Sequence, residues 1–211
     1  MSVERELVPT RSMLLELQAE HEVVLEGRSF LDHQQRLLAA ELLRQAEAAE
    51  RALRTFERLC SEAREATRLA IGRHGLEALL LRPAEPLDPL PLEERRRNYL
   101  GVLLLEVRLR LEEQAPPAAA SNPSPEALRA AERHRELLAN AAELAALSGN
   151  IQRLRLAYIR CERRVRALED VIEPELGAQI HRIGEELEEQ DREEIVRARR
   201  HGPQRDSRPR R

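Results

Sequence analysis

The stretch LLANAAELAALSGNIQRLRLAYIRCERRVRALEDVI, residues 137–172, carries the strongest structural signal in the chain. Alternate steps of three and four residues visit eleven positions, of which ten are apolar and one is Asn140: Leu137, Asn140, Leu144, Leu147, Ile151, Leu154, Tyr158, Cys161, Val165, Leu168 and Ile172. Such a repeat is typical of a coiled-coil seam, which is narrower than the apolar face of a helix in a globular domain. This stretch therefore predicts a long helix that packs along a second helix.

A second seam runs from Leu14 to Ala70, where thirteen of seventeen positions are apolar. Its large members are Leu14, Leu17, Val24, Leu31, Leu38, Leu42, Phe56 and Leu59, and its polar exceptions are His21, Arg28, Gln35 and Gln45. A helix from Arg11 to Arg73 would be roughly 95 Å long at 1.5 Å per residue. Folding back into an antiparallel pair lets each helix bury a seam that neither can bury alone. Homodimerisation is the alternative.

Beyond Ile172 the seam of the C-terminal stretch changes its spacing and continues through Leu176, Ile180, Ile183 and Leu187. Two successive steps of four residues form a stutter, which locally relaxes a left-handed supercoil. Pro174 lies inside the stutter, where its missing N–H and its ring disturb the helix. A slight kink is predicted at this position.

Proline, glycine and cap residues divide the chain into four parts. We expect an N-terminal long helix at 1–81, a central lobe with proline-rich linkers at 82–125, a C-terminal long helix at 126–202 and a disordered basic tail at 203–211. Ser124-Pro125 is typical of an N-cap followed by the first helical residue. The expected fold is all-α and elongated, a long antiparallel two-helix coiled coil of the N- and C-terminal helices with a small central lobe.

The lobe contains one candidate β element. Residues 105–111 alternate between apolar and charged side chains, as in a half-buried strand. No partner strand is evident, because residues 114–125 form a linker rich in alanine, serine and proline.

Composition excludes several functions. All 35 basic residues are arginine, so chemistry that needs a lysine amine, such as a Schiff base or a phosphate-binding Gly-Lys loop, is ruled out. The formal net charge of −3 offers no global attraction to nucleic acid or an anionic membrane. No apolar run approaches the roughly 18 residues of a membrane span. We expect no direct nucleotide, no nucleic-acid partner and no transmembrane segment.

No catalytic, cofactor or metal site is expected. None of the six histidines has a His or Cys three or four residues further on, and the acidic run around Glu185–Glu189 lacks an apolar pocket that would raise a pKa. Cys60 and Cys161 are interpreted as small core fillers. With residue 10 level with residue 200, Cys60 would lie level with about residue 150, roughly 15 Å along the axis from Cys161.

The order of motifs in the C-terminal helix resembles the D subunit, the central shaft of V-type and A-type rotary ATPases. Arg163–Glu169 is similar to the family's Arg-Arg-Val-Asn-Ala-Leu-Glu core, with Arg166 in place of the asparagine, and Pro174 follows it. An Arg/Glu-rich run and a basic end then follow, as in the family. At the other end, Pro9-Thr10-Arg11 and Gly27 resemble the family's opening helix, and residues 98–102 resemble the start of its lobe. Residues 32–36 lack the usual lysines.

The resemblance implies a non-catalytic rotor shaft that couples ATP synthesis or hydrolysis to ion translocation. It implies as partners the catalytic A and B subunits of the headpiece, the small F subunit and a C/d-type connector above the membrane ring. The location implied is cytoplasmic, peripheral to the inner face of the cell membrane. Candidate headpiece contacts are Arg11, Arg197, Arg199 and Arg200, although residues 9–11 equally fit a plain helix start. The alternative is a free-standing coiled-coil scaffold or homodimer with a basic tail.

Overall fold

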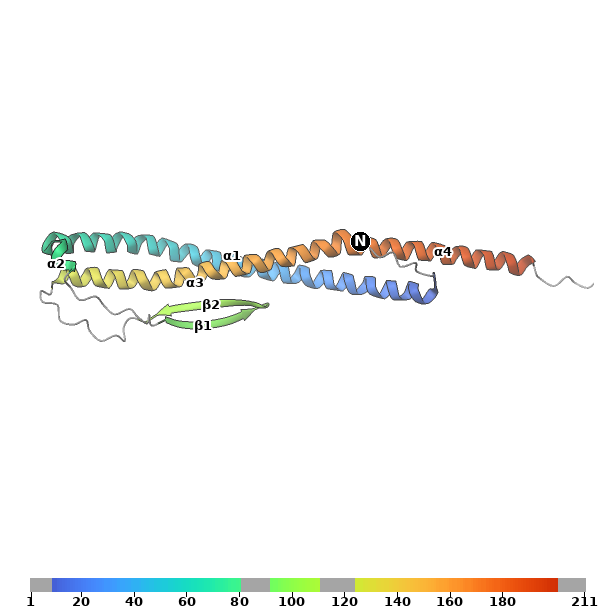
Figure 1. Ribbon diagram of the computed structural model, residues 1–211, viewed down its shortest axis with the longest axis horizontal. Coiled ribbons are helices and arrows are strands. Elements are labelled where there is room, and N and C mark those ends of the chain that lie inside the picture. Colours follow the sequence, from blue (N-terminus) through green and yellow to red (C-terminus); the bar gives the residue numbers. More distant parts are fainter. Residues whose placement is uncertain (1–8, 81–91, 111–123, 201–211) are drawn as a thin grey trace, which may run out of the picture. The chain divides into compact units, whose positions relative to one another are not determined.

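The computed structural model describes residues 9–80, 92–110 and 124–200, and the predicted tail at 203–211 lies outside them. Among these described residues, the fold is all-α except for one two-stranded antiparallel sheet. In chain order the elements are α1 (Arg11–His74), α2 (Leu76–Leu80), β1 (Leu92–Tyr99), β2 (Val102–Leu109), α3 (Pro125–Ala167), the π-helical turn η1 (Leu168–Ile172) and α4 (Glu173–Arg200) (Figure 1). Within these described ranges, no helix has the length and apolar character needed to cross a membrane.

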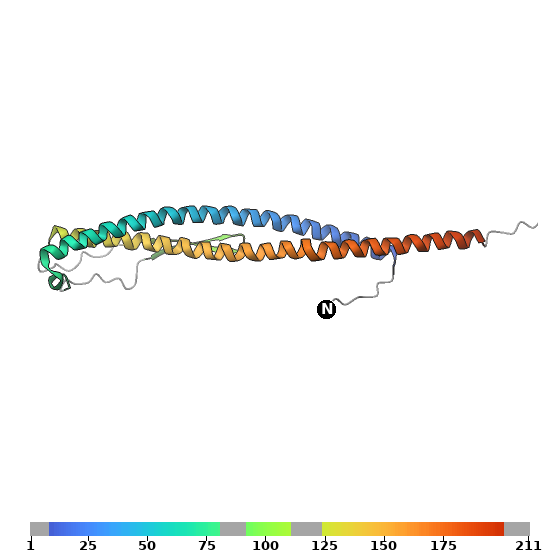
Figure 2. The same ribbon diagram turned by 90° about the horizontal axis from the view of Figure 1, so that it is seen from above.

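The chain divides into two compact units, residues 34–160 and residues 1–33 with 161–211. In the first unit, three contacts join α1 to α3: Gln45 bonds Asn150, Glu62 pairs with Arg133 and Arg73 pairs with Glu126. The residue number on α3 falls as the residue number on α1 rises. The helices of this unit are therefore antiparallel and lie side by side (Figure 2).

The unit of residues 1–33 and 161–211 has the same antiparallel arrangement. Arg11 pairs with Asp191, and Arg28 pairs with Glu173. Both units are therefore built by folding back within one chain, which is the arrangement that the two seams predict.

The buried side chains follow the two seams. In the unit of residues 1–33 and 161–211, Leu17, Leu176 and Ile183 form a buried cluster against which Leu14, Val24 and Leu187 pack. Other buried seam residues are Leu38, Leu59, Leu154 and Val165. Partly exposed seam residues are Leu31, Leu42, Phe56, Leu144, Ile151, Tyr158 and Leu168. Two helices enclose only a narrow strip between them, so many seam residues keep one side in solvent.

Ile172 is the seam residue that the sequence misplaced, because it is 38% exposed. The π-turn η1 explains this. The N–H of Glu173 bonds the carbonyl of Leu168, five residues back, and one turn thereby takes up an extra residue. Glu173 instead of Ile172 then faces α1, where it meets Arg28. The π-turn ends two residues before Pro174, where the sequence predicts a slight kink.

The helix starts have the predicted caps. The Thr10 hydroxyl accepts a hydrogen bond from the N–H of Met13 at 3.2 Å, and the Ser124 hydroxyl accepts one from the N–H of Ala127, also at 3.2 Å. The predicted end of the first helix near residue 81 was too late. Gly75, at φ +75°, adopts the left-handed conformation that closes α1 at His74, and α2 is a separate short helix.

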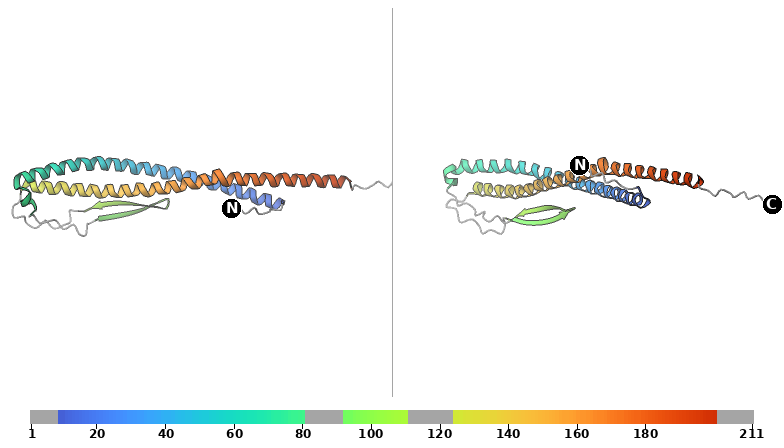
Figure 3. Two further views of the ribbon diagram at one scale, coloured as in Figure 1. Left: turned by 45° about the horizontal axis from the view of Figure 1, so that its top comes forward. Right: turned by 45° about the vertical axis from the view of Figure 1, so that its right-hand side comes forward.

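The candidate strand of the lobe overlaps β2, which pairs with β1. The expectation that this strand has no evident partner was therefore wrong. β1 and β2 pair from Leu92↔Leu109 to Tyr99↔Val102. Leu100 and Gly101 form the turn with φ of +50° and +81°, the positive values that a tight type I′ hairpin turn requires. Figure 3 shows the hairpin beside the helix pair of its unit. The partner lies upstream of the turn, in a charged stretch that lacks apolar alternation.

Burial in α3 generates a stability prediction. Leu154 is 0% exposed and Leu156, two residues further on, is 58% exposed. We expect Leu154→Ala to lower the free energy of unfolding by about 2–4 kcal/mol, because it removes buried methyl groups and leaves a cavity. The matched control Leu156→Ala should change it by under about 0.5 kcal/mol. Urea unfolding followed by circular dichroism measures both, and equal losses would contradict the assigned faces of α3.

Candidate functional site

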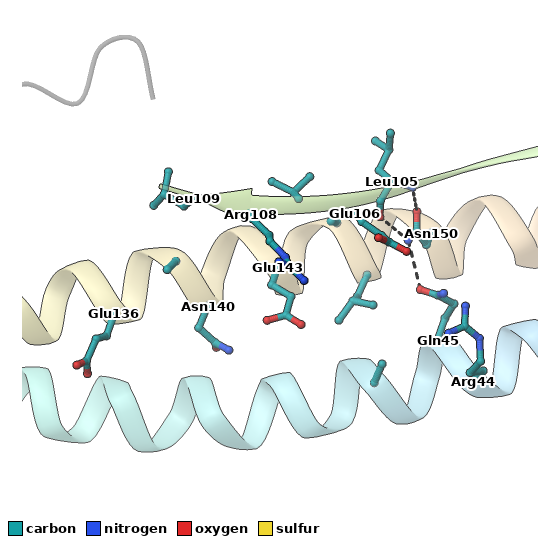
Figure 4. A pocket seen from close by; sticks show the side chains of 15 residues that line it. Arg44, Gln45, Leu105, Glu106, Arg108, Leu109, Glu136, Asn140, Glu143 and Asn150 are labelled. Carbon is teal, nitrogen blue, oxygen red and sulfur yellow. Dashed lines mark hydrogen bonds between the residues drawn. The ribbon is translucent and has the colours of Figure 1, made fainter. Parts of the chain in front are cut away.

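Asn150 joins the hairpin to α3 through both polar atoms of its side chain. This residue is 1% exposed. Its Oδ1 accepts a hydrogen bond from the N–H of Leu105, and its Nδ2 donates one to the carbonyl of Leu105, both at 2.8 Å (Figure 4). The side-chain amide therefore takes the place that a neighbouring strand would hold along the outer edge of β2.

The hydrogen bonds continue from Asn150 into α1. Asn150 Nδ2 also donates to Gln45 Oε1 at 3.3 Å, and Gln45 Nε2 donates to Glu41 Oε1 at 2.9 Å. Arg97 of β1 donates to the same Glu41 oxygen at 2.6 Å, and Arg44 contacts both Glu41 oxygens. This set, Glu41, Arg44, Gln45, Arg97 and Asn150, is called the polar network below. It holds both strands against both helices of the unit.

Tyr99 supplies a further anchor at the turn end of the hairpin. Its hydroxyl donates to the carbonyl of Leu37 at 3.2 Å, and the Arg97 guanidinium lies 5.5 Å from the centre of its ring. Leu104, on the same face of the sheet, is 1% exposed. The hairpin is thus fixed by apolar contacts of Val102 and Leu104 and by several polar ones.

The pKa of Glu41 is lowered from the ordinary value of 4.5. The hydrogen bond from Arg44 is the largest cause. Burial opposes it, and Gln45 and the nearby charges of Arg44 and Arg97 act in the same direction as the Arg44 bond. The carboxylate is therefore kept ionised in a buried position, where an unpaired charge would be costly.

A groove of about 700 Å³ lies between β2 and the helices next to the polar network. Charged side chains from Arg44, Glu106, Arg108, Glu136 and Glu143 line it together with aliphatic ones (Figure 4). Asn140 also borders the groove, and its buried Oδ1 has no hydrogen-bond partner among the described residues. In the described part of the chain, no three His, Cys, Asp or Glu side chains are grouped so as to hold a metal ion.

The second group of interactions lies in the unit of residues 1–33 and 161–211. Arg28 and Glu173 are half-buried and 2.5 Å apart. The Cys161 thiol donates to the Leu31 carbonyl at 3.4 Å, and burial raises the pKa of this thiol. Polar contacts therefore accompany the apolar seam here too.

The predicted headpiece contacts lie on exposed helix ends. Arg11 is 3.0 Å from Asp191, and both side chains are more than half exposed. Arg197 pairs with Glu193 at 2.8 Å. Arg199 and Arg200 are exposed in the last turn of α4. These arginines all lie in the unit of residues 1–33 and 161–211, but they do not form a single cluster.

The polar network was not predicted from the sequence. Glu41, Arg44, Gln45 and Asn150 stand beside or on seam positions, whereas Arg97 lies on β1. Of these residues, only Gln45 stands out in the sequence, as an exception to the apolar pattern. A polar residue at such a position is a signal for an interhelical hydrogen bond. Nothing in the sequence connected Gln45 to Arg97 or Asn150, which lie 52 and 105 residues away.

Known proteins match this chain over most of its length. The family model for the D subunit of ATP synthase matches residues 13–201. The V-type ATP synthase D subunit of Anaeromyxobacter sp. (strain Fw109-5) is 31% identical over 194 residues, which cover 90% of each chain. The A-type ATP synthase D subunit of Pyrococcus furiosus is 32% identical over 196 residues, covering 91% of each.

A match of this length identifies the family. The chain belongs to the family of ATP synthase D subunits.

Two asparagines of α3 provide a matched test of the polar network. Asn150→Ala should lower the free energy of unfolding by about 2–4 kcal/mol, because it leaves two backbone groups of Leu105 and the Oε1 atom of Gln45 without their partner. Asn140→Ala should change it by under about 1 kcal/mol, since Asn140 Oδ1 has no partner to lose. Urea unfolding measures both, and similar losses for the two variants would contradict the role of Asn150.

The lowered pKa of Glu41 predicts a contribution to stability that depends on pH. A carboxyl group whose pKa is lower when folded stabilises the protein fully above its unfolded value, here about 4.5, and loses this effect as the pH falls through the folded pKa. Wild type should therefore lose more stability than Glu41→Gln below about pH 4.5. Urea midpoints at pH 7 and pH 3 measure the difference, and parallel pH profiles would contradict it.

Proposed function

We propose that this chain is the non-catalytic central-stalk subunit, or rotor shaft, of a V/A-type ATP synthase. In this role it couples ATP synthesis or hydrolysis in the headpiece to ion translocation through a membrane ring. Its partners are the catalytic A and B subunits, the small F subunit and a connector subunit above the ring. Its location is the cytoplasm, peripheral to the inner face of the cell membrane.

The observation that carries the proposal is the antiparallel packing of the first and last helices. A shaft that transmits torque has to resist sliding of one helix along the other. Interlocking of Leu17, Leu176 and Ile183 opposes such sliding, because each side chain fits between side chains of the opposite helix. The half-buried pair of Arg28 and Glu173 adds a polar link at a fixed height.

The outer surface of α4 also suits rotation inside a ring of other subunits. Residues 188–200 are exposed throughout and carry both signs of charge. Arg192 pairs with Glu188 and Glu189, and Arg197 pairs with Glu193, all within one helix. Most of this surface is hydrated and its charges are locally balanced; Ile195 and Val196 are its exposed large apolar side chains, so it offers little apolar area that would hold the shaft at one angle.

Arg11, Arg197, Arg199 and Arg200 are the proposed contacts with the headpiece. The ion pair between Arg11 and Asp191 is solvent-exposed, so it contributes at most about 1 kcal/mol and can give way to an intermolecular pair. Arginine at these positions can bind carboxylates of a surrounding subunit in bidentate fashion.

Reconstitution tests the proposal. The chain is mixed with A, B and F subunits of the same organism, and a probe is attached to Leu43→Cys, an exposed position of α1, in a Cys60→Ser background. We expect stoichiometric incorporation and ATP-driven rotation of the probe. Recovery of the chain only with itself would contradict the proposal and favour a self-associating scaffold.

A charge-reversal pair provides the internal control. Glu173→Arg places two cations together and should lower the free energy of unfolding by about 1.5–3 kcal/mol, with a lower rotational torque. Adding Arg28→Glu restores an opposite-charge pair and should recover most of both quantities. Unchanged torque in Glu173→Arg would show that this contact carries no load.

A further inference from the structure

The outer edge of β1 presents backbone groups that the hairpin does not use. Arg96 lies opposite Leu105, whose N–H and carbonyl are both bonded to Asn150. Arg96 and Leu105 therefore exchange no hydrogen bonds, and the N–H and carbonyl of Arg96 point away from β2. In an antiparallel ladder every second residue has this orientation, so the backbone N–H and carbonyl groups of Leu92, Glu94 and Asn98 also point away from β2. These backbone groups have no partner within the described residues.

This edge is fully exposed and basic. Every residue from Leu92 to Asn98 is exposed. Arg95, Arg96 and Arg97 are consecutive. Arg97 is held by Glu41, and Arg96 lies 3.4 Å from Glu94, but Arg95 has no ion pair in the described part of the chain. The two carboxylates and three guanidinium groups of residues 93–97 leave β1 with a net charge of +1, and Arg95 lies opposite Glu106 in the register.

The β2 half of one face of the hairpin is apolar and only partly covered. Leu92 and Leu103 are 42% and 47% exposed, and the register places both on this face with Leu105, Val107 and Leu109. The helices pack instead against the opposite face, through the buried Val102 and Leu104. On β1 the same face carries Glu94, Arg96 and Asn98, so a strand added beside β1 would lie next to these polar side chains.

We propose that β1 is a strand-addition site whose occupant is an acidic extended segment of a neighbouring ATP synthase subunit. Backbone hydrogen bonds to Glu94 and Arg96 supply affinity, and acidic side chains opposite Arg95 and Arg96 supply specificity. The inference rests on the proposed function, which provides the neighbouring subunits.

Hydrogen exchange measured on the free chain and on the assembled complex tests the proposal directly. The amides of Glu94 and Arg96 should exchange on the order of 100-fold more slowly after assembly. The amide of Val107, on the outer edge of β2, is the internal reference and should change little. Assembly with unchanged exchange at 94 and 96 would overturn this inference while leaving the proposed function intact. Failure to assemble would overturn the proposed function itself, and the inference with it.

A proline substitution separates the backbone from the side chain. Glu94→Pro removes an outward N–H and keeps the bonds to β2, whereas Glu94→Ala keeps the N–H. We expect Glu94→Pro to weaken incorporation about tenfold and Glu94→Ala less than twofold. The unfolding midpoint of the proline variant verifies that its hairpin is intact. Equal incorporation of both variants would overturn the proposal, as would protection of these amides by anionic phospholipid vesicles alone.

Discussion

The structure depends on one constraint: each long helix carries an apolar strip too narrow to form a core by itself. Burying that strip requires a second strip of matching spacing, and the opposite end of the same chain supplies it. Both units meet this constraint in the same way, with a segment of α1 antiparallel to a C-terminal helix. Other features mark the ends of the helices that pack in this way: Thr10 and Ser124 cap their starts, and Gly75 ends α1. The hairpin packs on the helix pair of its own unit.

Polar residues at the seam give the packing its alignment. Apolar side chains repeated every seven residues fit almost equally well after a shift of one heptad. They therefore define which faces of the helices meet, but not how far one helix is shifted along the other. Gln45 with Asn150 and Arg28 with Glu173 lose their partners after such a shift. The π-turn before Pro174 serves the same alignment, because it brings Glu173 to the side chain of Arg28.

These properties explain what the sequence predicted and what it did not. The spacing of Leu17, Leu38 and Leu154 identified the buried faces. The predicted alignment of the two helices along their axis was wrong, because Cys60 borders a groove with His134 and Leu137 and not with residue 150. Matching two heptad repeats end to end cannot select among equivalent registers. β1 was missed because its side chains are mostly charged, so its pairing is defined by backbone bonds and a turn with Leu100 at positive φ. The polar network required contacts between residues far apart in the sequence.

The central claim, that the two ends of one chain pair antiparallel in this register, is tested most directly by a disulfide to the native Cys161. The Cys161 sulfur lies 3.4 Å from the carbonyl oxygen of Leu31. In a Cys60→Ser background, Leu31→Cys should form an intramolecular disulfide under mild oxidation. Phe30→Cys, whose position is 68% exposed, should form little. Covalent dimers in place of crosslinked monomers, or equal crosslinking from positions 30 and 31, would contradict the account.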